Sequence, residues 1–310
     1  MATRRGGVAR RLARGLKPAV DTVAGWSTVV ALRAVRLIPP DRISTFAGRI
    51  LRLIGPWRSE HQVGRANLEA AFPEKSPAEI EKILRSVWEN LGKVAAEYAH
   101  LDRLWDYDFE RGGGGRIEVS DEVLQRFFRL GNEARPALVF GAHIGNWELP
   151  PVAAKARGLE IANLYRRPNL GKVADAIARI RAVNMGTLIP ADFDAAFRLA
   201  AALERGIHVG ILVDQHFSRG VDVTFFGRRC KANPMIARLA RRLESPIHGT
   251  RVIRLPGNRF RIDLTEAIAP ARDSDGQIDV ARTMQTITAV VEDWVREYPE
   301  QWLWLHRRWR

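Results

Sequence analysis

The sequence predicts an α/β protein: a three-layer α/β/α domain with a mostly parallel central sheet and an N-terminal helical extension. Two observations support this fold class. From residue 137 onward, short apolar runs typical of buried strands alternate with helical stretches, which is the pattern of βαβ units in a parallel sheet. The chain has 310 residues and no Pro/Gly/Ser-rich linker in its middle, so we expect one globular domain.

The N-terminal segment, residues 1–40, is expected to lie outside this domain, which would then span residues 41–310. Residues 1–17 carry six basic side chains and no acidic one. Residues 22–32 follow as an uncharged run of eleven residues that includes Trp26. Eleven residues are fewer than the ~20 that span a bilayer. Basic flanks and a tryptophan are instead typical of a helix that lies in the membrane interface.

Helices dominate the first third of the domain. Residues 76–79, Ser-Pro-Ala-Glu, form a capping box with proline at the first helical position, so a helix is expected to begin there. Apolar side chains then recur at helical spacing as far as Tyr98, which predicts a long amphipathic helix with one face in the core. Residues 116–119 predict a strand, and residues 121–130 predict another helix.

The sheet is predicted from the second half of the chain. Four strands are expected over residues 137–140, 160–165, 186–189 and 207–213, with helical stretches between them. Residues 247–255 and 259–264 flank a Pro-Gly-Asn turn and predict a hairpin. A last helix is expected over residues 280–296, before an aromatic and basic tail.

The basic excess of the chain is local. The formal net charge is +14, and residues 1–17, residues 228–261 and the last ten residues together carry more than all of it. Such patches attract polyanions, whether nucleic acid, an anionic membrane surface or an acidic protein. The sequence has no zinc-finger spacing, no basic region with heptads and no RNA-recognition signature, so nucleic acid is not expected as a partner. An anionic membrane surface is expected instead.

Cys230 is the only cysteine, which excludes an intrachain disulfide and a cysteine-based zinc site and suits the cytoplasm. Basic neighbours can lower the pKa of a thiol. Because no cysteine-protease pattern surrounds Cys230, we expect a structural or incidental role. The sequence also lacks a metal-ligand constellation, a nucleotide-binding glycine fingerprint and a Gly-x-Ser-x-Gly nucleophile elbow. No metal, cofactor or acyl-enzyme is therefore expected.

His143 is the first candidate catalytic residue. It follows the apolar run at 137–141, at the carboxyl end of an expected strand, where α/β folds build active sites. A histidine there can act as a general base, and Glu148, five positions on, can orient its imidazole if the turn brings the two together. A histidine at a strand end is also commonly a hydrogen-bonded structural residue. These residues alone do not decide between the two roles.

Four blocks along the chain carry a resemblance to a known family. They are Gly-Ala-His-Ile-Gly-Asn-Trp-Glu at 141–148, Tyr-Arg-Arg-Pro at 165–168, Asp-Gln-His at 214–216 with Phe-Phe-Gly at 225–227, and Pro-Glu-Gln-Trp-Leu-Trp-Leu-His-Arg-Arg at 299–308. In order and spacing they resemble the lysophospholipid acyltransferase superfamily. The closest resemblance is to the late acyltransferases of lipid A biosynthesis, the lauroyl and myristoyl transferases of Gram-negative bacteria.

This resemblance implies an O-acyltransferase of the same three-layer fold. A fatty acyl chain would pass from an acyl thioester, of acyl carrier protein or else of CoA, to a hydroxyl of a lipid A precursor, with His143 as general base. The enzyme would work at the cytoplasmic face of the inner membrane. Acyl carrier protein is strongly acidic, which suits the basic patches. A lysophospholipid, glycolipid or ornithine lipid acceptor stays open, and so does a non-catalytic basic protein that binds lipid or nucleic acid.

Two carboxylates compete as the partner of His143. The superfamily pattern favours Glu148, whereas some relatives take the orienting carboxylate from the later acidic block, here Asp214. Either would fix the imidazole tautomer that leaves the other ring nitrogen free to accept a proton. We favour Glu148.

The resemblance also implies substrate-binding residues. Arg166 follows an expected strand, and its guanidinium is expected to bind phosphate groups by paired hydrogen bonds. The remaining candidates are Asn146, Gln215 and an aromatic turn expected to line an acyl slot, namely Phe225, Phe226 and Gly227. After this turn the family commonly has small hydroxyl residues, whereas this chain has Arg-Arg-Cys-Lys-Ala-Asn-Pro at 228–234. Asn233 there is expected to cap the next helix.

Overall fold

The computed structural model describes residues 27, 30, 34–111, 113, 115–132, 135–166 and 179–309. The basic segment 1–17, Trp26 and most of the uncharged run at 22–32 lie outside the described residues. Arg167 lies outside them as well. Within the described part, no helix has both the length and the apolar character needed to cross a membrane.

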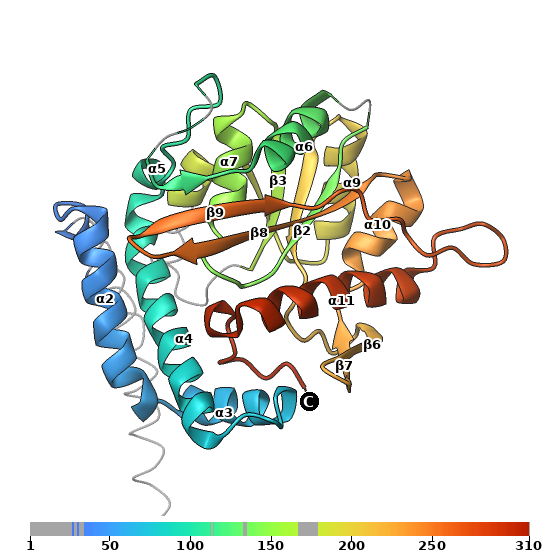
Figure 1. The fold of residues 1–310 in the computed structure, drawn as a ribbon. Helices are drawn as coiled ribbons and strands as arrows, with labels where there is room; N and C mark the ends of the chain where they lie inside the picture. Colours follow the sequence, from blue (N-terminus) through green and yellow to red (C-terminus); the bar gives the residue numbers. More distant parts are fainter. Residues whose placement is uncertain are drawn as a thin grey trace, which may run out of the picture.

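A seven-stranded sheet forms the centre of the molecule, in the order β1-β9-β8-β2-β5-β3-β4 (Figure 1). Its strands are β1 (Ile117–Glu118), β2 (Leu138–Gly141), β3 (Ile161–Tyr165), β4 (Thr187–Pro190), β5 (His208–Leu212), β8 (Ile247–Leu255) and β9 (Arg259–Leu264). Neighbouring strands run parallel, except for the antiparallel pair of β8 and β9. The mostly parallel sheet predicted from the alternation of strands and helices is confirmed.

Helices cover both faces of this sheet (Figure 1). They are α6 (Asp121–Asn132) and α7 (Leu149–Ala156) on one face, and α9 (Ala195–Glu204), α10 (Met235–Leu243) and α11 (Val280–Glu297) on the other. Successive side chains of a strand point to opposite faces. Leu138 and Phe140 of β2 accordingly lie in the core beside α9, α10 and α11, whereas Val139 packs against Leu130 of α6. The predicted α/β/α layering is confirmed.

The helices before the sheet form a second group beside it (Figure 1). They are α2 (Pro40–Ile54), η1 (Gly55–Trp57), α3 (Ser59–Ala71), α4 (Pro77–Glu97), η2 (Tyr98–His100) and α5 (Leu101–Leu104). The predicted capping box is present, since Ser76 Oγ accepts from the Glu79 N–H and the Glu79 carboxylate accepts from the Ser76 N–H at 2.8 Å. α2 and α4 approach closely at Gly92, where a Cβ would lie 2.4 Å from the Ala47 carbonyl oxygen.

A buried ion pair ties this group to the sheet. The Glu97 carboxylate of α4 accepts from Arg254 Nη1 at 2.6 Å and Nη2 at 2.8 Å, and also from Ser44 Oγ of α2 and Asn146 Nδ2. Burial raises the pKa of Glu97, but the charge and hydrogen bonds of Arg254 outweigh it, so the pKa is lowered. Two helices, strand β8 and the loop after β2 therefore meet at one ionised carboxylate.

One pair of strands was not predicted. β6 (Val221–Phe225) and β7 (Arg228–Ala232) form a separate antiparallel hairpin. Its turn residues, Phe226 and Gly227, have φ values of +52° and +69°, which is typical of a tight two-residue turn. In β7, Cys230 and Ala232 are buried while their neighbours are more exposed. This alternation does not stand out in the sequence because three of the four residues at 228–231 are basic. Asn233 acts as expected, because its Oδ1 accepts from the first N–H of α10 at 3.1 Å.

Candidate active site

Three of the predicted site residues lie at the same edge of the sheet. β2, β5 and β3 are parallel neighbours, so their carboxyl ends meet at one edge. His143 follows β2, Asp214 follows β5 and Arg166 follows β3. This edge is where ligands bind in open α/β sheets.

Asp214 is the carboxylate that contacts His143. Its Oδ1 accepts from His143 Nδ1 at 2.8 Å, and its Oδ2 accepts from the His143 backbone N–H at 2.8 Å. The indole N–H of Trp302 donates to the same Oδ2 at 2.7 Å. Asp214 is almost completely buried. Burial raises its pKa, but the charge and hydrogen bonds of His143 outweigh burial and hold the pKa well below its ordinary value.

The same pairing makes His143 a stronger base. Burial lowers the pKa of its imidazole, but the charge and hydrogen bond of Asp214 outweigh burial, so the pKa is raised. Since Asp214 stays ionised, the neutral imidazole carries its proton on Nδ1 and leaves Nε2 as the acceptor. Gln215 Nε2 lies 3.3 Å from this nitrogen and can donate to it.

Glu148 does not contact the imidazole, which corrects the preference for it as the orienting carboxylate. Its Oε2 accepts from Arg181 Nε at 3.0 Å, and its Oε1 accepts from Trp147 Nε1 at 3.1 Å. Glu148 is the N-cap residue of α7, and its carboxylate forms an ion pair with Arg181. Its negative charge still contributes to the raised pKa of His143.

The C-terminal tail is hydrogen-bonded to the loop that carries His143. The Gly145 N–H donates to the Gln301 carbonyl at 3.1 Å, and the Leu303 N–H donates to the His143 carbonyl at 3.0 Å. Gly145 has φ +56°, and a Cβ there would lie 1.7 Å from the Val252 carbonyl oxygen. Glycine alone fits this position, which explains its place in the block at 141–148.

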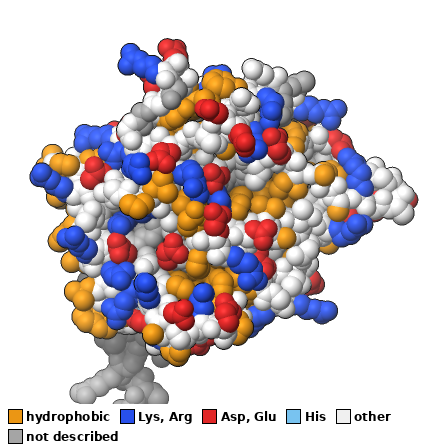
Figure 2. Space-filling model, viewed as in Figure 1, with side chains coloured by type: hydrophobic (Ala, Val, Ile, Leu, Met, Phe, Trp, Pro, Cys, Tyr) orange, Lys and Arg blue, Asp and Glu red, His pale blue; other side chains and the backbone are white. Residues whose placement is uncertain are grey.

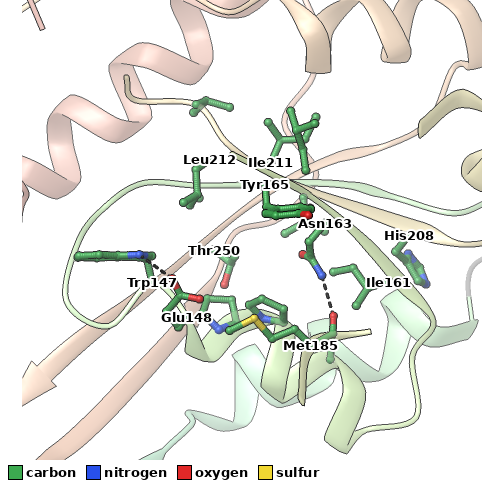
Figure 3. Close-up of a pocket in the computed structure, with 18 of the residues that line it drawn as sticks. Trp147, Glu148, Ile161, Asn163, Tyr165, Met185, His208, Ile211, Leu212 and Thr250 are labelled. Atoms are coloured by element: carbon green, nitrogen blue, oxygen red, sulfur yellow. Dashed lines mark hydrogen bonds between the residues drawn. The ribbon is translucent and has the colours of Figure 1, made fainter. Parts of the chain in front are cut away.

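A cavity of about 630 Å³ opens beside His143 and runs along one face of the sheet. Residues of β3 and β5 line it on the sheet side, and residues of α6 and α7 line it on the opposite side. Figure 3 shows Trp147 and Glu148 at one end and Ile161 and His208 at the other, with Tyr165 and Asn163 between them. The apolar residues along it include Phe127, Leu130, Val139, Ala154, Leu159, Ile161, Met185, Ile211 and Leu264. The lining is therefore mainly apolar, with polar groups at the His143 end and with Asn163 and His208 farther along the cavity.

Gln215 and Arg166 line this cavity, as their predicted roles require. Arg166 is exposed. The aromatic turn does not line the cavity: Phe225 and Phe226 are buried in the core, where their rings contact those of Trp302 and Trp304. The expectation that Phe225, Phe226 and Gly227 line an acyl slot is therefore wrong, and core packing explains the two rings.

Asn146 is also part of the framework rather than of the cavity wall. It is fully buried, its Nδ2 donates to Glu97 at 2.8 Å and its Oδ1 accepts from the Glu148 N–H at 3.1 Å. The predicted substrate contact is corrected accordingly. Asn146 links the buried ion pair of α4 to the start of α7.

Two residues of this site, Trp302 and Arg181, were not predicted from the sequence. Trp302 belongs to the block at 299–308, but nothing in a tail sequence shows that its indole reaches a carboxylate 88 positions earlier. Arg181 belongs to no block, and its pairing with Glu148 depends on how the chain returns after β3. Both contacts are non-local, so no local pattern signals them.

The basic region at 228–261 is not one free cationic surface. Acidic side chains from elsewhere in the chain pair with its arginines, as Asp263 and Glu297 do with Arg251 and as Glu118 does with Arg259. Figure 2 shows basic and acidic side chains intermixed over one face of the molecule. The tail is also internal, since Trp302, Trp304 and Arg308 are buried.

Comparison with known families decides which chemistry this arrangement belongs to. Residues 16–310 match the family described as bacterial lipid A biosynthesis acyltransferase. The chain belongs to this family. A comparison with curated proteins gave no match.

As a lipid A biosynthesis acyltransferase, the chain is an enzyme that transfers an acyl group from a donor to a lipid acceptor. The family match covers all four blocks on which the predicted resemblance rests. Among the residues that the structure describes, no group of three His, Cys, Asp or Glu side chains is arranged to hold a metal ion.

Proposed function

We propose that this acyltransferase moves a fatty acyl chain from the thioester of acyl carrier protein to a hydroxyl of a lipid A precursor, with His143 as general base. The observation that carries the proposal is the hydrogen-bonded pair of His143 and Asp214 at the polar end of an apolar cavity. A base oriented by a buried carboxylate suits deprotonation of a hydroxyl. The apolar cavity suits a hydrocarbon chain.

The reaction is a direct transfer. The acceptor hydroxyl takes the place of the Gln215 amide at His143 Nε2, and the imidazole removes its proton as the oxygen attacks the thioester carbonyl carbon. The tetrahedral intermediate then collapses and the carbon–sulfur bond breaks. The leaving thiolate takes the proton from His143, so the enzyme returns to its starting state. Asp214 stays ionised throughout and stabilises the imidazolium.

Each end of the cavity has its own part in binding. We place the acyl chain along β3 and β5, with its thioester at the His143 end. Arg166, at the mouth of the cavity, binds a phosphate of the acceptor or of the donor's phosphopantetheine arm.

Acyl carrier protein is the donor that fits a chain of net charge +14, because carrier proteins are acidic. Since the acceptor is a membrane lipid, we place the enzyme at the cytoplasmic face of the inner membrane.

The test is transfer by the purified enzyme. Acyl carrier protein or CoA loaded with a fatty acid is offered with a lipid A precursor, and mass spectrometry follows a gain of one acyl group. We expect transfer from the carrier protein and its loss in His143→Ala, with an unchanged circular dichroism melt. Retention of most activity in this variant would refute the base assignment. Efficient transfer from CoA alone would refute the donor assignment.

A further inference from the structure

α2 has an apolar face that is exposed in the part of the chain that the structure describes. Phe46, Ile50, Leu53, Ile54 and Trp57 recur at helical spacing along α2 and η1, and all five are exposed. The exposed fraction is 61% for Phe46 and Leu53 and 80% for Trp57. We call these five side chains the α2 face. The opposite side of the helix is buried, so the whole element has one side in the protein and one side open.

Basic side chains accompany the α2 face. Arg42 and Arg49 of the same helix are exposed. Figure 2 shows hydrophobic and basic side chains next to one another along the edge of the molecule where Figure 1 places α2. An apolar strip with arginines and a tryptophan is typical of a helix that lies in the plane of a membrane interface. A second copy of the chain on this face would instead bring arginines toward arginines.

α2 is held at the edge of the sheet where the cavity opens. Asn258, in the turn at the carboxyl end of β8, donates to the Asp41 carbonyl at 3.4 Å. Ser44 of α2 and Asn146 of the His143 loop donate to the same carboxylate, that of Glu97. A surface that bound the α2 face would therefore lie on the active-site side of the molecule.

We propose that the α2 face docks on an anionic lipid bilayer and brings the edge of the sheet that carries His143 to the membrane. The choice of a bilayer as the occupant rests on the proposed function, whose acceptor is a membrane lipid. This contact belongs to the folded domain and is separate from the basic segment at residues 1–17. With about 1.5 Å of rise per residue, the 15 residues of α2 offer a contact about 22 Å long.

Fluorescence from a single labelled position tests this docking. Cys230 is the only cysteine, so Cys230→Ala in the full chain permits Phe46→Cys to carry a polarity-sensitive fluorophore. The matched control carries the label at Ser274→Cys, in the exposed loop between β9 and α11, which extends on the side away from α2 (Figure 1). Vesicles contain phosphatidylcholine alone or mixed with an equal part of phosphatidylglycerol.

We expect a blue shift and quenching by brominated lipid at position 46, stronger with phosphatidylglycerol, and neither change at position 274. Co-sedimentation of the chain with vesicles without a shift at position 46 would overturn the proposal. A shift that depends on protein concentration and needs no vesicles would show a second copy on this face and would also overturn it. The readout involves no catalysis, so a shift at position 46 in a protein that transfers no acyl group would support docking and refute the proposed function.

A second variant links docking to turnover. Phe46→Ser, Leu53→Ser and Trp57→Ser together remove apolar surface at exposed positions, where folding depends little on the side chain. We expect transfer to an acceptor embedded in anionic vesicles to fall several-fold, and transfer to a detergent-dispersed acceptor to stay unchanged. Equal transfer to the vesicle acceptor by the variant and the unsubstituted chain would refute the role of the α2 face.

Discussion

Asp214 accepts three hydrogen bonds at one carboxylate, two from His143 and one from Trp302. The bond from the His143 backbone fixes the loop, the bond from Nδ1 fixes the tautomer, and the indole fixes the carboxylate itself. Glu148 lies on the same cavity but is held by Arg181 and Trp147. The two acidic residues that the sequence left in competition therefore have different surroundings, and substitution can separate them.

Asp214→Asn is expected to reduce kcat far more than Glu148→Gln. Loss of the orienting carboxylate of a catalytic triad costs about 10⁴ in rate, because the imidazole loses its tautomer and its counter-charge. Glu148→Gln leaves the contact between His143 and Asp214 in place. Steady-state kinetics of both purified variants gives the comparison. Equal, near-wild-type rates for both would show that neither residue orients His143.

The pH dependence of kcat/KM reports the raised pKa of His143. A general base must be neutral to accept a proton, so activity is expected to rise with pH along a limb whose midpoint lies above 6.5, the ordinary value for histidine. In Asp214→Asn the charge that raises this pKa is absent, and the limb should move to lower pH. A midpoint that is the same in both proteins would assign the limb to another group.

Trp302 is a positioning residue in this arrangement. Trp302→Phe keeps the ring in the core but removes the donor to Asp214, and we expect kcat to fall about tenfold, or ~1.4 kcal/mol, with KM little changed. Trp304→Phe is the matched control, because its indole donates to the Pro299 carbonyl and not to Asp214. A structural effect alone would lower the melting temperature of both variants and leave their pH profiles alike.

The ion pair of Glu97 and Arg254 joins α4 to β8, and both side chains are buried. Breaking a buried pair leaves an uncompensated charge, so Glu97→Ala is expected to cost about 3–5 kcal/mol in the free energy of unfolding, measured by urea denaturation. Asp102→Asn is the control, since the exposed pair of Asp102 and Arg36 should contribute less than about 1 kcal/mol. Equal costs would mean that Glu97 does not hold these elements together.

The elements also show how far the sequence could predict the structure. The strands β2, β3 and β5 and the helices α4 and α11 were predicted to within a few residues, because apolar periodicity and caps are local signals. The hairpin of β6 and β7 was not, because charged side chains occupy its open face. The position of His143 at a strand end was predictable in the same way. Its partner was not, since Asp214 reaches it through strand order rather than spacing.

The charge of a segment in the sequence does not give the charge of the surface that it forms in the folded protein. The region at 228–261 has ten basic residues and one acidic residue in sequence, yet folding surrounds several of its arginines with carboxylates from other segments. The α2 face is the opposite case, because apolar residues at helical spacing in a sequence do not show by themselves whether the side chains are buried or exposed. Only the fold shows that they stay exposed. We therefore propose that membrane contact is shared by the N-terminal segment and the α2 face.

Removal of residues 1–33 tests this division. The cut leaves Arg36 in place, which pairs with Asp102 at 2.7 Å, so the folded domain should be unaffected. The segment removed carries six basic side chains in its first 17 residues, whose attraction to an anionic surface is screened by salt. It also carries the uncharged run at 22–32, whose apolar contact with a bilayer would persist in high salt. We expect the full chain to stay with the membrane fraction in high salt and the truncated chain to be released. The truncated chain should still transfer acyl groups to a detergent-dispersed acceptor.

In low salt the truncated chain should bind anionic vesicles through the α2 face, and Phe46→Ser with Trp57→Ser should abolish that binding. A truncated chain that stays wholly membrane-bound in high salt would contradict the anchor role of the N-terminal segment, because the α2 face would then suffice alone.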